Sequence, residues 1–275
     1  MSEATGKHQV CITLDFDTVS LWIAMGQTSP TPISRGEFGV VGAERLLKLF
    51  EQHGLQTTWF MPGLTIDTFE SACKEVANAG HEIAHHGYDH VAPGGLDRSG
   101  ELDQLRRGND AIERVSGRRA RGYRSPAWDL SGNSVELLLQ EGFVYDSSMM
   151  GHDYVPYRAR SGDLVQAGEQ VQFGDATALW ELPISWSADD FPHFEYFRGG
   201  GLSAADAVLA NWLDDFRYMQ ENYERGVMTY TLHPFVIGRG HRMKMLDRLL
   251  TTLREEGAEF VTAEQAIEGW QASDA

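Results

Sequence analysis

Short apolar runs alternate with amphipathic segments along the whole chain. The runs predict strands at Val10–Phe16, Thr57–Pro62, His81–His85, Gly122–Arg124, Phe143–Asp146, Leu179–Ile184, Val227–Leu232 and Glu259–Thr262. Between most of them, apolar residues recur at helical spacing. This spacing predicts helices at Gly42–His53, Glu101–Val115, Ser134–Gln140, Ser203–Tyr223 and Met243–Glu256.

This alternation predicts an α/β fold, because strands that alternate with helices pair in parallel through right-handed crossovers. For 275 residues, a distorted, TIM-like (β/α) barrel of seven or eight strands is favoured over an open doubly wound sheet. No dinucleotide fingerprint supports the open sheet, since the run Gly199-Gly200-Gly201 follows no clear strand. Without an internal repeat or a linker, a single domain over residues 1–275 is expected.

Three stretches interrupt the alternation, at residues 18–39, 151–178 and 185–201. Long loops in a compact domain are usually functional walls, lids or subunit contacts. The alternative is that their aromatic side chains only cover the ends of the barrel.

Composition narrows the class of protein. Hydrophobic residues make up 42% of the chain, which excludes disorder. The 40 acidic against 23 basic residues give a net charge of -17, which disfavours binding to nucleic acid or to an anionic membrane. Cys11 and Cys73 lack the spacing of a zinc knuckle. With no export signal and no apolar run of membrane-spanning length, we expect a cytoplasmic protein.

Two carboxylates end the first predicted strand. Asp15 and Asp17 are two residues apart, so in a strand they project to the same side. Carboxylates beside Cys11 and Leu14 need a partner, since an unpaired buried charge is costly. Pairing of Asp15 with an arginine and a turn cap at Asp17 would explain them equally well.

Four of the ten histidines lie within residues 81–90. The spacing of His86 and His90 would place both rings on one face of a helical turn, within reach of one cation. His85 has the wrong spacing for a ligand and is expected to lie behind the metal ligands or in the pocket. His81, at the start of its strand, is assigned a structural role. A surface histidine cluster is the alternative.

Taken together, two histidines and one carboxylate form a three-residue site of the kind used by catalytic zinc, and the second carboxylate is free to act as a general base. Each candidate lies at the carboxyl end of a strand, where barrel active sites form. Arg124-Ser125-Pro126 and Leu232-His233-Pro234 follow two further strands.

These motifs resemble those of the polysaccharide deacetylase (NodB-homology) superfamily, metal-dependent amide hydrolases with a distorted (β/α) barrel. The resemblance extends over five short motifs between residues 10 and 262. It implies that Asp15 is the base, oriented by Arg124, and that His233 is the general acid. It also implies that the metal ligands are Asp17, His86 and His90.

Two departures from the usual pattern point to one branch of the superfamily. Phe16 separates the aspartates, which typically are adjacent, and Arg124 is followed by Ser125 rather than directly by proline. These details resemble the branch of cytoplasmic peptidoglycan deacetylase-like proteins, metal-independent allantoinases and cyclic imide hydrolases. The complete metal triad argues against the metal-free type.

Three functions follow as hypotheses. The first is a metal-dependent hydrolase that opens a small cyclic imide or cyclic amide, the second an N-deacetylase of peptidoglycan or another N-acetylated glycan, and the third a non-catalytic binding relative. For the first, a closed apolar pocket is expected from Trp22, Trp128, Trp186 and Phe191, with His85 nearby. No role is assigned to the Asp189-Asp190 pair.

One divalent ion per chain is expected, with Zn²⁺ first and Co²⁺, Mn²⁺ or Ni²⁺ also compatible with N/O ligands. The expected partners are a small-molecule substrate and further copies of the chain. The branch resemblance suggests a homo-oligomer, such as a tetramer.

Overall fold

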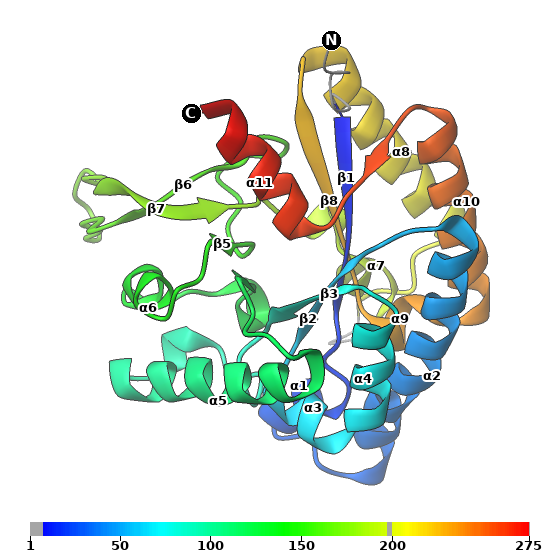
Figure 1. Ribbon diagram of the computed structural model, residues 1–275, viewed down its shortest axis with the longest axis horizontal. Helices are drawn as coiled ribbons and strands as arrows, with labels where there is room; N and C mark the ends of the chain where they lie inside the picture. Colours follow the sequence, from blue (N-terminus) through cyan, green and yellow to red (C-terminus); the bar gives the residue numbers. More distant parts are fainter. Residues whose placement is uncertain (1–7, 197–199, 275) are drawn as a thin grey trace.

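The computed structural model describes residues 8–196 and 200–274, which are built around one curved sheet (Figure 1). Its strands are β1 (His8–Asp15), β2 (Thr58–Met61), β3 (Glu82–His85), β4 (Gly122–Tyr123), β5 (Tyr145–Asp146), β6 (Tyr157–Ser161), β7 (Asp175–Glu181), β8 (Gly226–Leu232) and β9 (Glu259–Phe260). The strand order is β6-β7-β5-β4-β3-β2-β1-β8, and β9 pairs with β1. All pairs are parallel except β6 with β7.

The predicted α/β fold with a distorted barrel is confirmed. The sheet curls only part of the way round, because its end strands β6 and β8 are not paired with each other. A single parallel bridge between Asp189 and Thr231 connects the segment after β7 to β8. The bridge places the segment after β7 beside the carboxyl end of β8, so the two sides of the curled sheet meet around one opening.

Most helices surround the curved sheet, and α11 (Ala263–Asp274) packs against its concave side (Figure 1). The helices are α1 (Val19–Ala24), α2 (Pro30–His53), α3 (Gly63–Thr68), α4 (Glu70–Asn78), α5 (Arg98–Ser116), α6 (Ser134–Gln140), α7 (Asp190–Phe194), α8 (Ala205–Asn222), α9 (Pro234–Ile237), α10 (Gly240–Glu255) and α11. Short 3-10 turns occupy Pro93–Gly95, Pro126–Trp128 and Trp186–Ala188. Among the described residues, no helix has both the length and the apolar character required to cross a bilayer.

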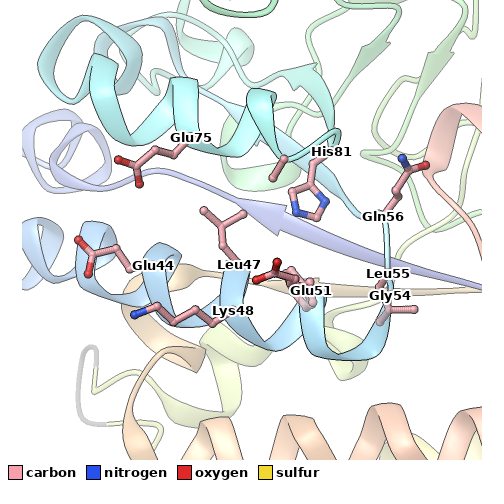
Figure 2. A pocket seen from close by; sticks show the side chains of 11 residues that line it. Glu44, Leu47, Lys48, Glu51, Gly54, Leu55, Gln56, Glu75 and His81 are labelled. Atoms are coloured by element: carbon pink, nitrogen blue, oxygen red, sulfur yellow. The ribbon is translucent and has the colours of Figure 1, made fainter.

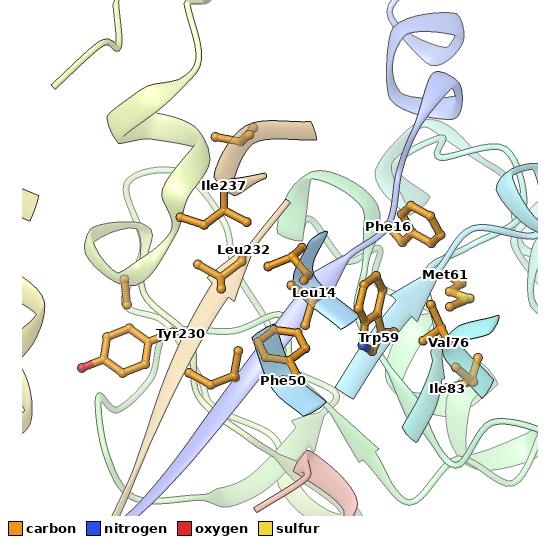
Figure 3. Packing of buried hydrophobic residues seen from close by; sticks show 14 of the residues in the cluster. Leu14, Phe16, Phe50, Trp59, Met61, Val76, Ile83, Tyr230, Leu232 and Ile237 are labelled. Carbon is orange, nitrogen blue, oxygen red and sulfur yellow. The ribbon is translucent and has the colours of Figure 1, made fainter. Parts of the chain in front are cut away.

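The two faces of β1 explain where the polar site forms. Val10, Ile12 and Leu14 belong to the large apolar cluster between sheet and helices, part of which is drawn in Figure 3. Cys11 belongs to a second, smaller cluster inside the curl of the sheet. Because side chains alternate along a strand, Asp15 lies on the same face as Cys11. The carboxylate therefore lies at the mouth of the barrel interior.

The stretch 18–39, expected to be a loop, is mostly helical. It contains α1, and α2 begins at Pro30 rather than at Gly42. Glycines allow α2 to pack closely here, since a Cβ at Gly36 would lie 2.5 Å from the backbone oxygen of Thr18. A Cβ at Gly42 would collide with the backbone oxygen of Pro234. Gly36, from the stretch expected to be a loop, and Gly42 thus let α2 support the turns that follow β1 and β8.

The other two stretches also contain regular structure. Residues 151–178 include β6 and the start of β7, which form an antiparallel hairpin. Residues 185–201 include a 3-10 turn and α7. Gly199 lies outside the described residues, so the Gly199–Gly201 run is not fully described.

Candidate active site

Three potential metal-binding side chains meet at the carboxyl ends of β1 and β3. Asp17 Oδ1 lies 3.4 Å from His86 Nε2 and 3.4 Å from His90 Nε2. All three residues are buried. One potential ligand atom from each lies within 4.8 Å of the other two. Asp17 Oδ1 accepts no hydrogen bond from the residues that the structure describes. Burial acts to raise the pKa of Asp17, but His90 and His86 outweigh it and hold the pKa well below its usual value.

The hydrogen bonding of His86 suits metal coordination. Its Nδ1 lies 2.7 Å from the backbone oxygen of Arg124, which can only accept. Nδ1 therefore carries a proton, which leaves Nε2, on the side of Asp17, as the nitrogen that a metal ion would bind. Two imidazole nitrogens and an otherwise unpartnered carboxylate oxygen form a donor set that fits a divalent cation.

The two histidines do not meet on a helical turn, as their spacing suggested. β3 ends at His85, and the following five residues form no helix. Gly87 and His90 have φ angles of 70° and 63°, and the ring centroids of His86 and His90 are 5.0 Å apart. A positive φ is uncommon for a histidine and marks a conformation that the surrounding packing imposes. A tight loop, rather than helical periodicity, brings the rings together.

Asp15 is paired with Arg124 from the end of β4. Arg124 Nη1 donates to Asp15 Oδ1 at 2.7 Å and to Thr13 Oγ1 at 2.9 Å. The opposite side of the guanidinium donates to the backbone oxygen and hydroxyl of Ser147. Asp15 Oδ2 faces His86 Nε2 at 3.9 Å. The carboxylate is thus held with one oxygen on the arginine and the other towards the Asp17–His86–His90 cluster.

His233 lies across the cluster, directly after β8. Its Nε2 is 3.7 Å from Asp17 Oδ2, and its Nδ1 is 2.8 Å from Asp190 Oδ1. The backbone nitrogen of His233 also donates to Asp190. Burial acts to lower the pKa of His233, but Asp189 and Asp190 outweigh burial and raise the pKa to about 10. Asp190 therefore fixes the ring so that Nε2 faces the centre of the site.

A small cavity of about 160 Å³ opens onto these polar groups. Its polar lining consists of Asp15, Asp17, His86, His90, Asp189 and His233. The rest of the lining is apolar and consists of Leu21, Met25, Ala127, Trp128, Trp186 and Phe191. Trp128 and Trp186 stack with their ring centroids 4.1 Å apart. Ala127 and Trp128 have φ angles of 57° and 54°, a conformation that turns the Trp128 loop over the cavity. A polar floor under an apolar rim is typical of a site for a small molecule.

Comparison with known proteins places this geometry in a family. The model of the family described as polysaccharide deacetylase matches residues 7–145. A peptidoglycan deacetylase of Helicobacter pylori is 34% identical over 271 residues, covering 92% of each chain. The chain belongs to the polysaccharide deacetylase family. The resemblance drawn from the sequence motifs is thereby confirmed.

Solved structures agree with this deacetylase-family assignment. A crystal structure from Mycobacterium smegmatis assigned to the polysaccharide deacetylases superposes with a TM-score of 0.88 at 28% identity, covering 100% of this chain and 94% of the other. The Puue allantoinase superposes with a TM-score of 0.79 at 19% identity, covering 97% and 91%, and shows the same fold. The protein is accordingly a hydrolase of the polysaccharide deacetylase family with a possible Asp/His/His metal site.

Two residues expected in the pocket of this family member do not line it. Trp22 is fully buried and packs edge-on against Phe235, with the Arg35 guanidinium over its ring. Leu21, its neighbour in α1, lines the cavity in its place. The rotation of α1 directs Trp22 into the core. Its orientation could not be predicted as long as this stretch was expected to be a loop.

His85 is also buried away from the cavity. Its Nε2 is 3.0 Å from the backbone oxygen of Leu105, and its Nδ1 accepts from the backbone nitrogen of Gly87. Burial lowers the pKa of His85 to about 3, so the ring is neutral. Its role in the structure is to anchor α5 and the turn that leads to His86.

Sequence reasoning assigned no role to the two aspartates that flank His233 in space. Asp190 holds the imidazole, and Asp189 contributes to the cavity wall. The signal was present, because the adjacent pair follows a predicted strand and lies within the aromatic-rich stretch 185–201. What was missing was the contact with His233, which is 43 residues further along the chain.

A wider hollow of about 660 Å³ lies between α2 and α4 (Figure 2). Glu44, Lys48, Glu51 and Glu75 surround it, and His81 forms part of its base. The hollow adjoins the amino ends of β2 and β3, whereas the metal-binding cluster lies beyond the carboxyl ends of β1 and β3. Apart from His81, which was expected to be structural, it contains none of the predicted site residues.

Proposed function

We propose that this family member opens the ring of a small cyclic imide or related cyclic amide by metal-dependent hydrolysis. The observation that supports this substrate class is the cavity above the polar cluster. Its volume of about 160 Å³ is well below the roughly 300–1,000 Å³ of pockets that take drug-sized ligands. Stacked Trp128 and Trp186, with Phe191, offer flat apolar surfaces to a planar ring.

In this proposal Asp17, His86 and His90 hold one divalent ion, with Zn²⁺ as the first candidate. When bound, such an ion supplies Lewis acidity towards the substrate carbonyl and the attacking water. The remaining chemistry is proton transfer, which is the task of the chain's own side chains.

Asp15 is proposed as the general base. Its Oδ1 is committed to Arg124, so Oδ2 is the oxygen that takes the proton of the attacking water. Arg124 positions this carboxylate through a hydrogen-bond network that involves Thr13 and Ser147 as well. This arrangement leaves Oδ2 free on a side chain that lines the cavity, where a general base has to lie within hydrogen-bond reach of the attacking water.

His233 is proposed as the general acid. With Nδ1 bound to Asp190, the ring exchanges its proton with the substrate through Nε2, which faces the cavity. An amide nitrogen leaves poorly unless it gains a proton, so the C–N bond breaks as His233 protonates the nitrogen. Base and acid line the same cavity, as this two-proton reaction requires.

Deacetylation of an N-acetylated glycan is the second candidate. It is favoured by the 34% identity to the Helicobacter pylori peptidoglycan deacetylase. The same cluster would cleave the acetamide C–N bond by the same two proton transfers. The two candidates differ in the space required above the cluster, since a polymer needs an open cleft with several subsites.

A panel of substrates tests the proposal with one metal-loaded preparation. We expect kcat/KM to be highest for succinimide, glutarimide, hydantoin or allantoin, with little release of acetate from an N-acetylglucosamine oligomer. The His86→Ala protein, prepared alongside, controls for contaminating hydrolases. Deacetylation of the oligomer without opening of any five- or six-membered imide would establish the second candidate instead.

A further inference from the structure

Asp189 occupies a distinctive place in the cavity wall. Its backbone forms a parallel bridge with Thr231 of β8, so the residue is held at the mouth of the sheet. Its side chain is buried, with 1% of the residue exposed, and it lines the cavity beside His233. Asp190, by contrast, is taken up by the ring and the backbone nitrogen of His233.

The two carboxyl oxygens of Asp189 have different surroundings. Oδ1 accepts the backbone N–H of Phe191 at 2.8 Å and faces His233 Nδ1 at 3.5 Å. No described residue forms a hydrogen bond with Oδ2. This oxygen is also not fully enclosed by the protein. Oδ2 is therefore the oxygen that Asp189 can offer to a molecule in the cavity.

The charges around Asp189 favour its neutral form. Burial is the largest influence and raises the pKa of Asp189 to about 8, His233 opposes it, and Asp190 and Asp15 add to it. An ionised Asp189 raises the pKa of His233, but Asp190 is the carboxylate that holds the His233 ring and backbone nitrogens. Asp189 is therefore the carboxyl group of this pair that takes up a proton. A proton on Asp189 resides on Oδ2, because Oδ1 is occupied as the acceptor of the Phe191 N–H.

We infer that Asp189 is a specificity-determining residue whose Oδ2–H donates a hydrogen bond to the second carbonyl oxygen of a cyclic imide. This inference rests on the proposed function. When the C–N bond breaks, its electron pair goes to the nitrogen and is shared with the oxygen of the carbonyl that remains attached to it. Asp189 stabilises that oxygen without transferring its proton, and the nitrogen receives its proton from His233.

This arrangement would separate imides from acetamides. An acetylated amino sugar has no carbonyl on the leaving side of the scissile bond, so the hydrogen bond from Asp189 would find no acceptor there. An unmatched buried donor costs binding energy, whereas an imide satisfies it.

Two substitutions separate the donor role from the structural role of Asp189 as the cap of α7. Asp189→Asn keeps an oxygen for the Phe191 N–H and places an amide donor where Oδ2 was. Asp189→Ser keeps the cap but is too short to reach the cavity as well. Both variants are compared with the wild-type protein in thermal unfolding midpoint, metal content and kcat/KM for succinimide.

We expect Asp189→Ser to lose roughly 10²–10³-fold in kcat/KM, the usual cost of removing one donor to a developing oxyanion. Asp189→Asn is expected to stay within about 10-fold of wild type, and both variants to retain its unfolding midpoint and metal content. Wild-type activity in Asp189→Ser, or an equal loss in both variants, would overturn the inference while leaving imide hydrolysis intact. A wild-type protein that opens no imide would overturn the proposed function and the inference with it.

Discussion

Arg124 and Asp15 form an ion pair that is fully enclosed by the protein. Arg124 Nη1 lies 2.7 Å from Asp15 Oδ1, and the side-chain exposures are 0% and 2%. The pair joins the carboxyl ends of β1 and β4, which are not neighbours in the sheet. It therefore crosses the mouth of the curled sheet and joins the first strand of the site to the fourth.

Removal of Arg124 should be strongly destabilising. Arg124→Met leaves the Asp15 carboxylate buried without its partner, a change that typically costs about 3–5 kcal/mol in the free energy of unfolding. Urea denaturation measures this cost, and Arg98→Met, which removes a solvent-exposed pair with Glu136, should cost less than about 1 kcal/mol. The double variant Arg124→Met/Asp15→Asn should recover part of the loss. Equal stability of Arg124→Met and the control Arg98→Met would contradict the pairing.

The two aspartates at the end of β1 should respond differently to substitution. Asp15→Asn is expected to retain the metal while kcat falls by roughly 10²–10⁴-fold, the usual contribution of a positioned proton-transfer group. Asp17→Asn should lower metal occupancy, since Asp17 Oδ1 is the oxygen nearest both histidine nitrogens. Elemental analysis together with turnover distinguishes the two effects. Loss of metal in Asp15→Asn alone would mean that the roles are exchanged.

Metal content provides an independent test of the His86–His90 pair. We expect one divalent ion per wild-type chain, loss of activity on chelation, and loss of the ion in both His86→Ala and His90→Ala. His241→Ala is the matched control, because His241 is exposed at the start of α10. Full activity in chelator, with no stoichiometric metal, would rule out a metal-dependent mechanism.

His81 should make the protein sensitive to acid. Its Nδ1 accepts the backbone N–H of Thr57 at 3.1 Å, and burial lowers its pKa from 6.5 to about 4. As pH falls below 6.5, the unfolded chain binds a proton that the folded chain does not, so the free energy of unfolding decreases. This contribution, present above pH 6.5, is lost progressively down to about pH 4.

Urea denaturation at pH 7.5 and pH 5 measures this effect. His81→Asn is expected to be less stable than wild type at pH 7.5 but to lose about 1–2 kcal/mol less on acidification. The same pH dependence in the variant and in the wild-type protein would show that His81 does not contribute.

Two tryptophans assigned to the pocket from sequence should behave in opposite ways. Trp22→Ala should destabilise the fold by about 3–5 kcal/mol, because the side chain is fully buried against Phe235. Trp186 is 46% exposed at the cavity rim, so Trp186→Ala should change stability by less than about 1 kcal/mol and raise KM for the substrate. Thermal unfolding and steady-state kinetics on the same preparations test both statements. A rise in KM without destabilisation in Trp22→Ala would contradict the structural assignment.

Homo-oligomerisation and a cytoplasmic location stay predictions. The first is tested by the mass of the purified protein in solution, for which we expect a multiple of the 30.7 kDa chain mass, such as a tetramer.

Several elements differ from the sequence prediction because packing outweighs local preference. Residues 30–41 contain two prolines, a serine and glycines, which favour loops, and yet they form the first half of α2. Gly36 and Gly39 in this half of the helix are used for close contact with Thr18, which no local pattern could indicate. The turn between His86 and His90 is a comparable case, since Gly87 and His90 adopt a left-handed conformation rather than a helix.

The sequence by itself determined the alternation of strands and helices and the residue types at the strand ends. These features depend on local periodicity, which fixes the side of a strand on which Asp15 lies and the segment in which His86 and His90 occur. Tertiary structure alone decided which atoms face one another: Asp190 rather than Asp189 on His233, Leu21 rather than Trp22 in the cavity, and Arg124 on one oxygen of Asp15. The physical reason is that each of these relationships joins segments far apart in the chain, or depends on how one helix is rotated against the core, and local spacing carries no information about either.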